Sequence, residues 1–493
     1  MKFAAWAALL CVFAASFGPA SAQPAAPAVP LAQLLAHMRA VNGGLWNAHM
    51  SSTSPHVIDG VPTIMDTEAQ GLQYVLTQCS GRVCMGTYFD GERVYSVNIN
   101  DTALPRSPAP EAYLRALRIL GTLQFLSPEF TAGGGRIDDG GWVTFQGKRC
   151  RRIFFSEKIA SPMQVFVDPQ TGLVAGAADV NGDATYVMRD YRRVGQFMLP
   201  YEIDRNGAPL ERYIARRIVL APLERPHGLT ATVSQTPAGM ALDPQGTTPI
   251  GTCEIGGVSA KCLIDTGNSA LSMSLELAEK LHLEPIGMMH IAGLGDYATE
   301  VVRAGPLKMG NVRFGDANYV VLSDINRYGY DVVIGADVLA SMPITIDYAK
   351  HALYFGGDTQ ADQQGTTVAL AFQNFVPVVN VTLGELPTAL AVDTGDQSNI
   401  NLAYQYYQQH PSLFQATKTE RVSGIGGTSE ELIGQIDSVR IGTLTAENQQ
   451  IGTTRILKGT ANGHLGAAFL SKYRITLDYA HQLLRLLPKT AKP

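Results

Sequence analysis

The chain has 493 residues, of which 46% are hydrophobic and 16% charged, and its formal net charge is -5. This apolar content is enough for two or three domains, because one core usually serves roughly 100–200 residues. Lys and Arg total 38 against 43 Asp and Glu, with no long block of one sign, which argues against a nucleic-acid partner. The 49 glycines and 27 prolines favour short strands and many turns.

The first 22 residues have the pattern of an export signal. Lys2 precedes an apolar run from Phe3 to Phe17, and Ala20-Ser21-Ala22 fits a small-residue cleavage site before Gln23. An uncleaved anchor is the competing interpretation, but the run is shorter than the ~20 residues that a bilayer requires. We therefore expect a cleaved signal peptide over residues 1–22, a periplasmic or secreted protein, and no membrane span after cleavage.

Five cysteines follow the signal: Cys79, Cys84, Cys150, Cys253 and Cys262. Five is an odd number, so at least one stays unpaired or pairs between chains. A two-residue turn at Gly257-Val258 would place Cys253 directly opposite Cys262 at disulfide distance, and Cys79 and Cys84 can close another small loop. For Cys150 a buried free thiol is an equal alternative. No spacing is that of a metal site, so we expect no metal.

A β-rich domain with one or two helices is expected over residues 36–225. An Ala/Pro-rich spacer, set at residues 23–35, precedes it, and helical spacing of apolar residues indicates a helix over residues 31–40. Strand-like runs separated by Gly, Asp and Pro turn signals follow, among them residues 72–98, 142–145 and 163–168. Prolines at 222, 226 and 237 mark the end of this domain.

The turn at residues 168–173, with strands on both sides, is loosely similar to the antiparallel sheet of periplasmic lipoprotein-carrier-like domains. A generic scaffold sheet is the equal alternative. No catalytic motif lies in this part of the chain.

The second half of the chain repeats itself. Asp265-Thr266-Gly267 and Asp393-Thr394-Gly395 each end an apolar strand and follow a proline at the same distance. Val333-Ile334-Gly335 then matches His464-Leu465-Gly466, and both copies close on an Asp-Tyr-Ala turn. Two tripeptides in register with further matching segments do not arise by chance. Residues 240–358 and 366–488 are therefore expected to be two copies of one domain.

These copies resemble the aspartic peptidase family in its short retropepsin-like form, duplicated in tandem, over about residues 240–488. The resemblance implies two β-barrel lobes that form a bilobal acid-protease fold, so the whole chain is expected to be mainly β with an N-terminal α+β domain. The short connection over residues 355–367 favours pairing of the two lobes within one chain. Pairing with a second molecule stays open, as does the oligomeric state.

The resemblance also implies the site. Two carboxylates within hydrogen-bond distance share one proton, so one activates a water as a base while the other polarises the scissile carbonyl. No metal or organic cofactor is implied. The dyad is Asp265 and Asp393, the cross-braces are Thr266 and Thr394, and the loop hinges are Gly267 and Gly395. Two structural turn aspartates are the alternative.

Gly-rich hairpins between the matching segments are candidate flaps over an extended peptide, at Gly293, Gly295, Gly424 and Gly426. Ordinary surface turns are the alternative. His464 precedes an apolar pair, and we expect a packed core or rim histidine rather than a participant in the chemistry.

Three positions depart from the pattern. Asn268 and Asp396 stand where the family usually has Ala or Ser, and Asp396 adds a negative charge that raises the proton affinity of the dyad unless it turns outward. The second copy has Ala468 where the first has Asp337. The sequence thus predicts an exported aspartic endopeptidase that acts on peptides or proteins. The alternative is a catalytically weak or inactive protease-like protein that binds peptides or envelope components.

Overall fold

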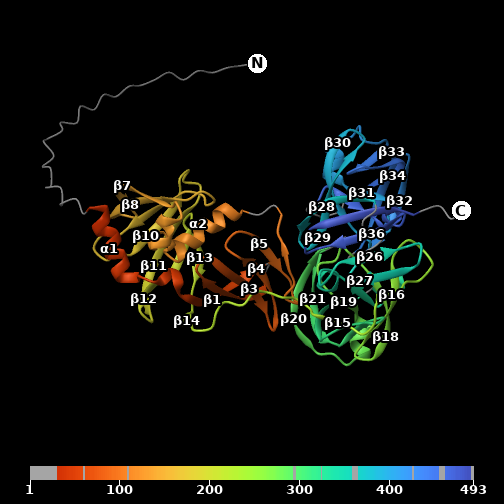
Figure 1. The fold of residues 1–493 in the computed structure, drawn as a ribbon, viewed down its shortest axis with the longest axis horizontal. Helices are drawn as coiled ribbons and strands as arrows, with labels where there is room; N and C mark the ends of the chain where they lie inside the picture. The colour runs from red at the N-terminus through yellow and green to blue at the C-terminus, as the bar shows by residue number, and fades with distance from the viewer. Residues whose placement is uncertain are drawn as a thin grey trace, which may run out of the picture.

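A computed structural model describes residues 30–58, 61–107, 110–292, 296–323, 325–357, 365–424, 427–454 and 461–489. An N-terminal domain lies beside two β-lobes, with lobe 1 in green and lobe 2 in blue (Figure 1). The fold is mainly β, as predicted. The expected signal peptide, residues 1–22, lies outside the described residues. Within those residues, no helix combines the length and apolar character that a bilayer crossing needs.

The N-terminal domain consists of two seven-stranded antiparallel sheets. The first has the order β14-β1-β2-β3-β4-β5-β6, with β1 (His49–Ile58), β2 (Val61–Gln70), β3 (Gln73–Ser80), β4 (Val83–Phe89), β5 (Val94–Val97), β6 (Ala103–Pro105) and β14 (Ala215–Val219). The second runs from β13 to β7 in reverse chain order, with β7 (Arg136–Phe145), β8 (Lys148–Ser156), β9 (Met163–Val167), β10 (Val174–Asp179), β11 (Thr185–Val194), β12 (Phe197–Arg205) and β13 (Ala208–Arg212).

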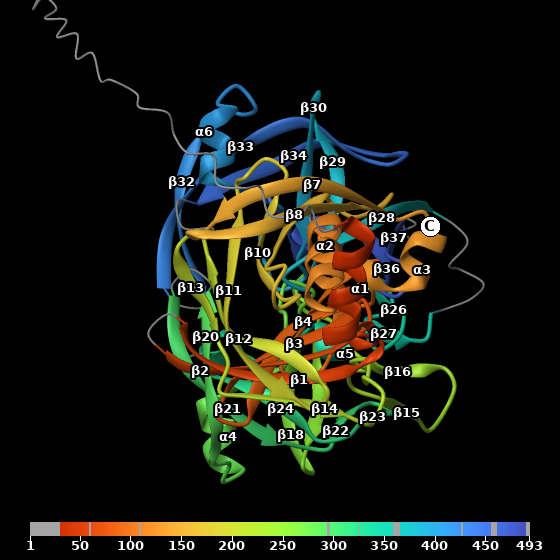
Figure 2. The same cartoon turned by 90° about the vertical axis from the view of Figure 1, so that its left-hand side faces the viewer.

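Short helices complete this domain: α1 (Leu31–Asn42), η1 (Leu45–Asn47), α2 (Glu111–Gly121), η2 (Gln124–Leu126) and α3 (Pro128–Ala132). Figure 2 shows α1 and α2 together in the end-on view of the domain. Helix α1 begins after Pro30 and buries Leu34 and Met38 in the domain core. The domain therefore begins at Leu31, not at residue 36 as predicted, because the apolar face of the helix needs the sheet to cover it.

Lobe 1 is built on a ten-stranded sheet with the order β15-β23-β22-β17-β18-β25-β19-β24-β21-β20. The elements of the lobe are β15 (Ala231–Val233), β16 (Ala238–Ala241), β17 (Ile250–Ile255), β18 (Val258–Ile264), β19 (Ser272–Ser274), α4 (Leu275–Lys280), β20 (Pro285–Ala292), β21 (Asp296–Ala304), β22 (Leu307–Met309), β23 (Val312–Phe314), β24 (Ala317–Leu322), η3 (Ile325–Tyr328), β25 (Val332–Ile334), α5 (Ala336–Leu339), β26 (Ile344–Asp347) and β27 (Ala352–Phe355). Since β15 pairs with β23, the lobe begins before the predicted residue 240.

Lobe 2 repeats this plan. Its elements are β28 (Thr366–Gln373), β29 (Val376–Leu383), β30 (Leu386–Val392), β31 (Ile400–Ala403), α6 (Tyr404–Gln409), β32 (Lys418–Gly424), β33 (Gly427–Ile441), β34 (Leu444–Thr454), β35 (Gly463–Leu465), α7 (Ala467–Leu470), β36 (Tyr473–Asp478) and β37 (Leu483–Pro488).

The two lobes share one sheet within the chain. Strand β26 of lobe 1 pairs with β36 of lobe 2, with Thr345 opposite Thr476. Outward from this pair lie β27 and β16 on one side and β37 and β28 on the other. One buried apolar cluster runs through both lobes. The lobes are therefore neighbours in a single chain, the arrangement that the short connection favoured.

The cysteine pairs are joined, but one register differs from the prediction. Cys79 and Cys84 face each other across the β3–β4 hairpin and form a disulfide. Cys253 and Cys262 are also bonded, at a Cα–Cα distance of 6.0 Å, but they are diagonal rather than directly opposite. The turn lies at Gly256-Gly257, both with positive φ, and not at Gly257-Val258. Two glycines tolerate this left-handed turn. Cys150 is a buried free thiol.

The N-terminal domain contacts both lobes (Figure 1). At the β3–β4 turn, the Arg82 N–H donates to the Ile286 carbonyl of lobe 1 at 2.8 Å. Val83 and Ile99 are buried among apolar side chains of lobe 1. On lobe 2, the Phe372 carbonyl accepts from the Ser107 N–H at 3.0 Å. The edge formed by β3 to β6 thus bridges the two lobes.

A polar contact at the same edge explains why the lobes differ at Asp337 and Ala468. Asp337 is 1% exposed in α5, and it accepts hydrogen bonds from the Nδ2 atoms of Asn98 and Asn100 and from the Leu271 N–H. Burial raises the pKa of Asp337 to about 6, although these donors oppose the shift. The acid of lobe 1 is therefore a docking point for the N-terminal domain.

Candidate active site

The two aspartates lie on equivalent loops at the ends of β18 and β30. Each of these strands pairs in parallel with the short strand that ends in the apolar-Gly segment, β25 or β35. The Asp265 N–H donates to the Ile334 carbonyl at 3.0 Å, and the Asp393 N–H donates to the Leu465 carbonyl at 3.1 Å. Each loop is thus held by the strand beneath it, at the place that the repeat predicted.

Thr266 and Thr394 are fully buried and cross-linked by four hydrogen bonds. The Thr266 N–H donates to Thr394 Oγ1 at 3.1 Å, and the Thr394 N–H donates to Thr266 Oγ1 at 3.0 Å. Each hydroxyl then donates to the carbonyl before the aspartate of the other lobe, Val392 or Ile264, at 2.6 Å. The threonines therefore fix the two aspartate loops against each other.

Positions 267 and 395 require glycine because the carboxyl group of the opposite aspartate lies too close for a side chain, and not because the backbone needs a hinge conformation. A Cβ atom at Gly267 would overlap the carboxyl group of Asp393, and one at Gly395 would overlap the carboxyl group of Asp265. Neither residue has a positive φ, so no left-handed backbone is involved. Gly335 is similarly confined beneath the first loop, where a Cβ would lie 2.6 Å from the Asn268 carbonyl oxygen.

The two aspartates influence each other electrostatically, and their pKa values shift in opposite directions. Burial, followed by the charge of Asp393, raises the pKa of Asp265 well above its usual value. Burial acts in the same direction on Asp393, but His464 and backbone donors outweigh it and hold the pKa of Asp393 below its usual value. Two neighbouring carboxylates with different surroundings can divide the acid and base roles between them.

His464 contacts the dyad, contrary to the expectation of a packed or rim histidine. Its Nδ1 lies 3.2 Å from Oδ2 of Asp393 and 3.3 Å from Oδ2 of Asp396. The nitrogen thus lies between the two carboxylates, and both contacts are ion pairs when the imidazole is protonated. Burial lowers the pKa of His464, but the two carboxylates more than compensate and raise it to about 10.

A signal for this contact was present in the sequence. Lobe 1 has Asn268 and Val333 at the positions of Asp396 and His464, so an acid and a base appear together in one copy only. Asp396 does not turn outward: its Oδ1 accepts from the Ser398 N–H at 2.8 Å while Oδ2 faces His464. Periodicity alone cannot reveal such a pair, because its members are far apart in sequence.

Within the described part of the chain, one group of three side chains has ligand atoms close enough for a metal ion. Asp393, Asp396 and His464 place these atoms within 4.8 Å of one another. A protonated imidazole supplies the same two carboxylates with a positive charge without a metal.

The predicted flaps coincide with two hairpins. Strands β20 and β21 form the hairpin of lobe 1, and β32 and β33 that of lobe 2. Gly424 ends β32, whereas Gly293, Gly295 and Gly426 lie outside the described residues. Glu431 on β33 is buried. Its burial, followed by the negative charge of Asp396, raises the pKa of Glu431 to about 7. The base of this hairpin therefore approaches the acidic side of the site.

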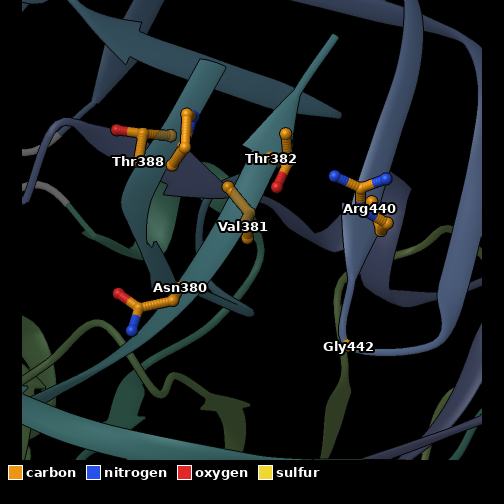
Figure 3. A pocket seen from close by; sticks show the side chains of 7 residues that line it. Asn380, Val381, Thr382, Thr388, Arg440 and Gly442 are labelled. Carbon is orange, nitrogen blue, oxygen red and sulfur yellow. The ribbon is translucent and has the colours of Figure 1, made fainter. Parts of the chain in front are cut away.

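A surface pocket on lobe 2 does not belong to this site. It is lined by Asn380, Val381, Thr382, Pro387, Thr388, Arg440 and Gly442, from β29, β30 and the end of β33 (Figure 3). None of the dyad residues lines it. At the aspartate loops, by contrast, the Asp393 side chain is 14% exposed and so remains open to solvent.

The comparison with known families agrees with the geometry of lobe 1. Residues 251–338 match the family described as aspartyl protease. The matched segment begins in β17 and ends in α5, and it includes the Asp265 loop and Asp337. The comparison with curated proteins gives no match. Lobe 1 thus contains an aspartyl protease-like domain.

Proposed function

We propose that this chain is an exported aspartic endopeptidase in which Asp265 and Asp393 activate a water that hydrolyses peptide bonds. The observation that carries the proposal is the reciprocal arrangement of the loops. Each threonine hydrogen-bonds into the opposite loop, and each glycine makes room for the opposite carboxyl group. Two aspartates that only stabilised their own turns would not require the two loops to bring their carboxyl groups together.

The dyad residues supply both halves of the reaction. A carboxylate takes a proton from water as the oxygen attacks the peptide carbonyl, and the neighbouring carboxylic acid donates a hydrogen bond and then a proton to the carbonyl oxygen. The gem-diol that forms collapses when the C–N bond breaks and the leaving nitrogen receives a proton. The hairpins β20–β21 and β32–β33 are proposed as flaps that hold an extended peptide over the dyad.

Export is part of the proposal and rests on the leader-like sequence of residues 1–22. The Cys79–Cys84 and Cys253–Cys262 disulfides support it, since such bonds persist mainly in oxidising compartments.

The test is cleavage of a diverse peptide library between acidic and neutral pH, with products identified by mass spectrometry. Asp265→Asn and Asp393→Asn should each abolish cleavage. Asp478→Asn is the matched control, because this aspartate also recurs in the repeat but pairs with His481 in a turn. Cleavage that survives both dyad variants would refute the proposal. Peptide binding without cleavage by the unmodified protein would favour the binding protein instead.

A further inference from the structure

Two departures of lobe 2 from lobe 1 lie in contact with each other. Asp396 replaces Asn268, and His464 replaces Val333. The replacement of Val333 is at an equivalent place, since Val333 lies opposite Leu263 of β18 and His464 lies opposite Ala391 of β30. The two new side chains, an acid and a base, then meet beside Asp393.

The pair preserves the charge of the site. A dyad that shares one proton carries one negative charge. Asp396 alone would add a second negative charge, which would favour protonation of Asp393. A positive charge on His464 cancels that addition, so the group of four side chains keeps the single negative charge of an ordinary dyad.

The pair also makes the two aspartates unequal. Oδ1 of Asp393 accepts from the Gly395 N–H at 2.9 Å and from the Asp396 N–H at 3.0 Å, and Oδ2 faces His464. Asp265 Oδ1 accepts from the Gly267 N–H at 2.8 Å, and Val333, the counterpart of His464, offers it no cation. Donors and positive charge stabilise an ionised carboxylate.

We propose that His464 is a positioning residue that holds Asp393 ionised and so places the shared proton on Asp265. This inference rests on the proposed peptidase function and assigns its roles. Asp393 takes the proton from the attacking water, and Asp265 gives its proton to the carbonyl oxygen. When the C–N bond breaks, Asp393 returns its proton to the nitrogen and Asp265 regains its own from the hydroxyl of the gem-diol. One water is consumed and His464 keeps its proton throughout.

The pKa directions agree with this assignment, raised for Asp265 and His464 and lowered for Asp393. Other titratable groups near the site are Tyr330, Tyr479 and Glu431. Burial raises the pKa of both tyrosines, so they stay neutral across the working range. Glu431 also titrates near the site, so every variant that is compared has to retain Glu431.

Two variants test the role through the pH dependence of kcat and kcat/KM. His464→Asn leaves Asp393 beside an uncompensated Asp396. We expect the acid limb of the profile to move upward by about one pH unit or more and kcat at pH 5 to fall about tenfold, with a smaller change in KM. The double variant Asp396→Asn/His464→Val installs the pair found in lobe 1. It should return the acid limb toward that of the unmodified enzyme and raise kcat above that of His464→Asn, because the net charge is restored, while kcat stays below that of the unmodified enzyme because His464 no longer distinguishes Asp393 from Asp265.

A purely structural role predicts a different result. If His464→Asn leaves the acid limb unmoved, or if the double variant is no better than the single one although both keep the Tm of the parent, the proposal is wrong. Zinc is the probe for the competing explanation. Stoichiometric zinc binding that is lost in His464→Asn, together with activity abolished by EDTA, would also overturn it.

Direct titration separates this proposal from the peptidase proposal, because it needs no activity. With ¹⁵N-labelled histidine in the full chain, the ring signal lost in His464→Asn identifies His464. We expect this imidazole to stay protonated above pH 8, whereas an unperturbed histidine titrates near ~6.5. A neutral His464 at pH 7 would refute the inference even if the protein cleaves peptides. A protonated His464 in a protein without activity would leave its charge role standing and remove the peptidase proposal.

Discussion

The contact between Asn100 and Asp337 predicts that the N-terminal domain stabilises the first aspartate loop. Asn100 Nδ2 donates to Asp337 Oδ2 and to the Asn318 carbonyl, both at 2.9 Å, and Asn100 Oδ1 accepts from the Asn318 N–H at 2.7 Å. Asp337 in turn accepts from the Leu271 N–H, six residues after Asp265. Asn100→Ala therefore removes three hydrogen bonds across the interface and leaves a buried carboxylate with fewer donors.

The expected cost follows from these bonds. A hydrogen bond to a charged group contributes about 2 kcal/mol and each neutral bond about 1 kcal/mol. Asn100→Ala should therefore lower the free energy of unfolding by about 4 kcal/mol. Asp337→Ala gives lobe 1 the residue that lobe 2 has at Ala468. In a double-mutant cycle the two changes should show a coupling energy of about 2 kcal/mol, because the charged bond is lost in either single variant.

Two probes follow the two sides of the interface. The only tryptophans after the leader are Trp46 and Trp142, so fluorescence in urea follows the N-terminal domain. Hydrogen exchange of the peptide over residues 265–272 follows the loop in lobe 1. Asn100→Ala should weaken protection of this peptide. Asn206→Ala is the control, since Asn206 bonds to Asp183 and Thr185 within the N-terminal domain, and it should leave the loop unchanged. A coupling energy below about 0.5 kcal/mol, or unchanged exchange in Asn100→Ala, would refute the reasoning.

Three further predictions concern the site. Gly267→Ala should abolish cleavage and lower Tm, because the added methyl group overlaps the Asp393 carboxyl group. Gly315→Ala is the control, since a Cβ there meets no atom within 4 Å, and it should change neither cleavage nor Tm. Equal Tm values for the two variants would contradict the prediction. Thr266→Val leaves the Thr394 N–H and the Val392 carbonyl without their hydrogen-bond partner. Urea unfolding should therefore show a free energy of unfolding that is lower by about 3 kcal/mol, and kcat should fall more than KM rises. Thr266→Ser is the control, because it keeps both hydrogen bonds. Glu431→Gln tests pH dependence: the folded pKa of about 7 exceeds the unfolded value, so this group makes stability fall as pH rises from about 4.5 to 7, and the variant should lose less Tm between pH 5 and 8 than its parent.

The sequence repeat predicted that Asp265 and Asp393 occupy equivalent positions, because the repeat depends only on local spacing along the chain. Each Asp-Thr-Gly follows a strand whose apolar residues are buried, and the apolar-Gly segment recurs at nearly the same distance. Those constraints place Asp265 and Asp393 on equivalent loops. The predicted turn at Gly257-Val258 is one residue too late, because the sequence contains glycine in either register and only the fold shows that Ile255 pairs with Val258 and that Gly256 and Gly257 have positive φ.

Contacts between segments that are far apart in the sequence could not be predicted from the repeat or from local spacing. The apolar neighbours of His464 in the sequence favour a packed histidine, and nothing in the sequence shows that Asp396 lies against it in the fold. The N-terminal domain showed no motif that indicated its contact with Asp337. In both cases the partner of a charged residue lies on another element, and a single sequence does not state which elements meet.

These two contacts give a common reason for the inequality of the lobes. A duplicated enzyme with two identical lobes would offer two equivalent aspartates and two equivalent outer faces. In this chain Asp337 is present in lobe 1 alone, where Asn98 and Asn100 donate hydrogen bonds to it. Asp396 is present in lobe 2 alone, where His464 faces it. A buried charge that loses its partner destabilises a protein by several kcal/mol. Asp337 is 1% exposed, so it depends strongly on its partners, whereas Asp396 is 18% exposed and depends on His464 less for stability than for the charge balance of the site. The docking of the N-terminal domain on lobe 1 and the proposed inequality of Asp265 and Asp393 both depend on a partner for an acid that only one lobe has, and each is tested by removing that partner rather than the acid.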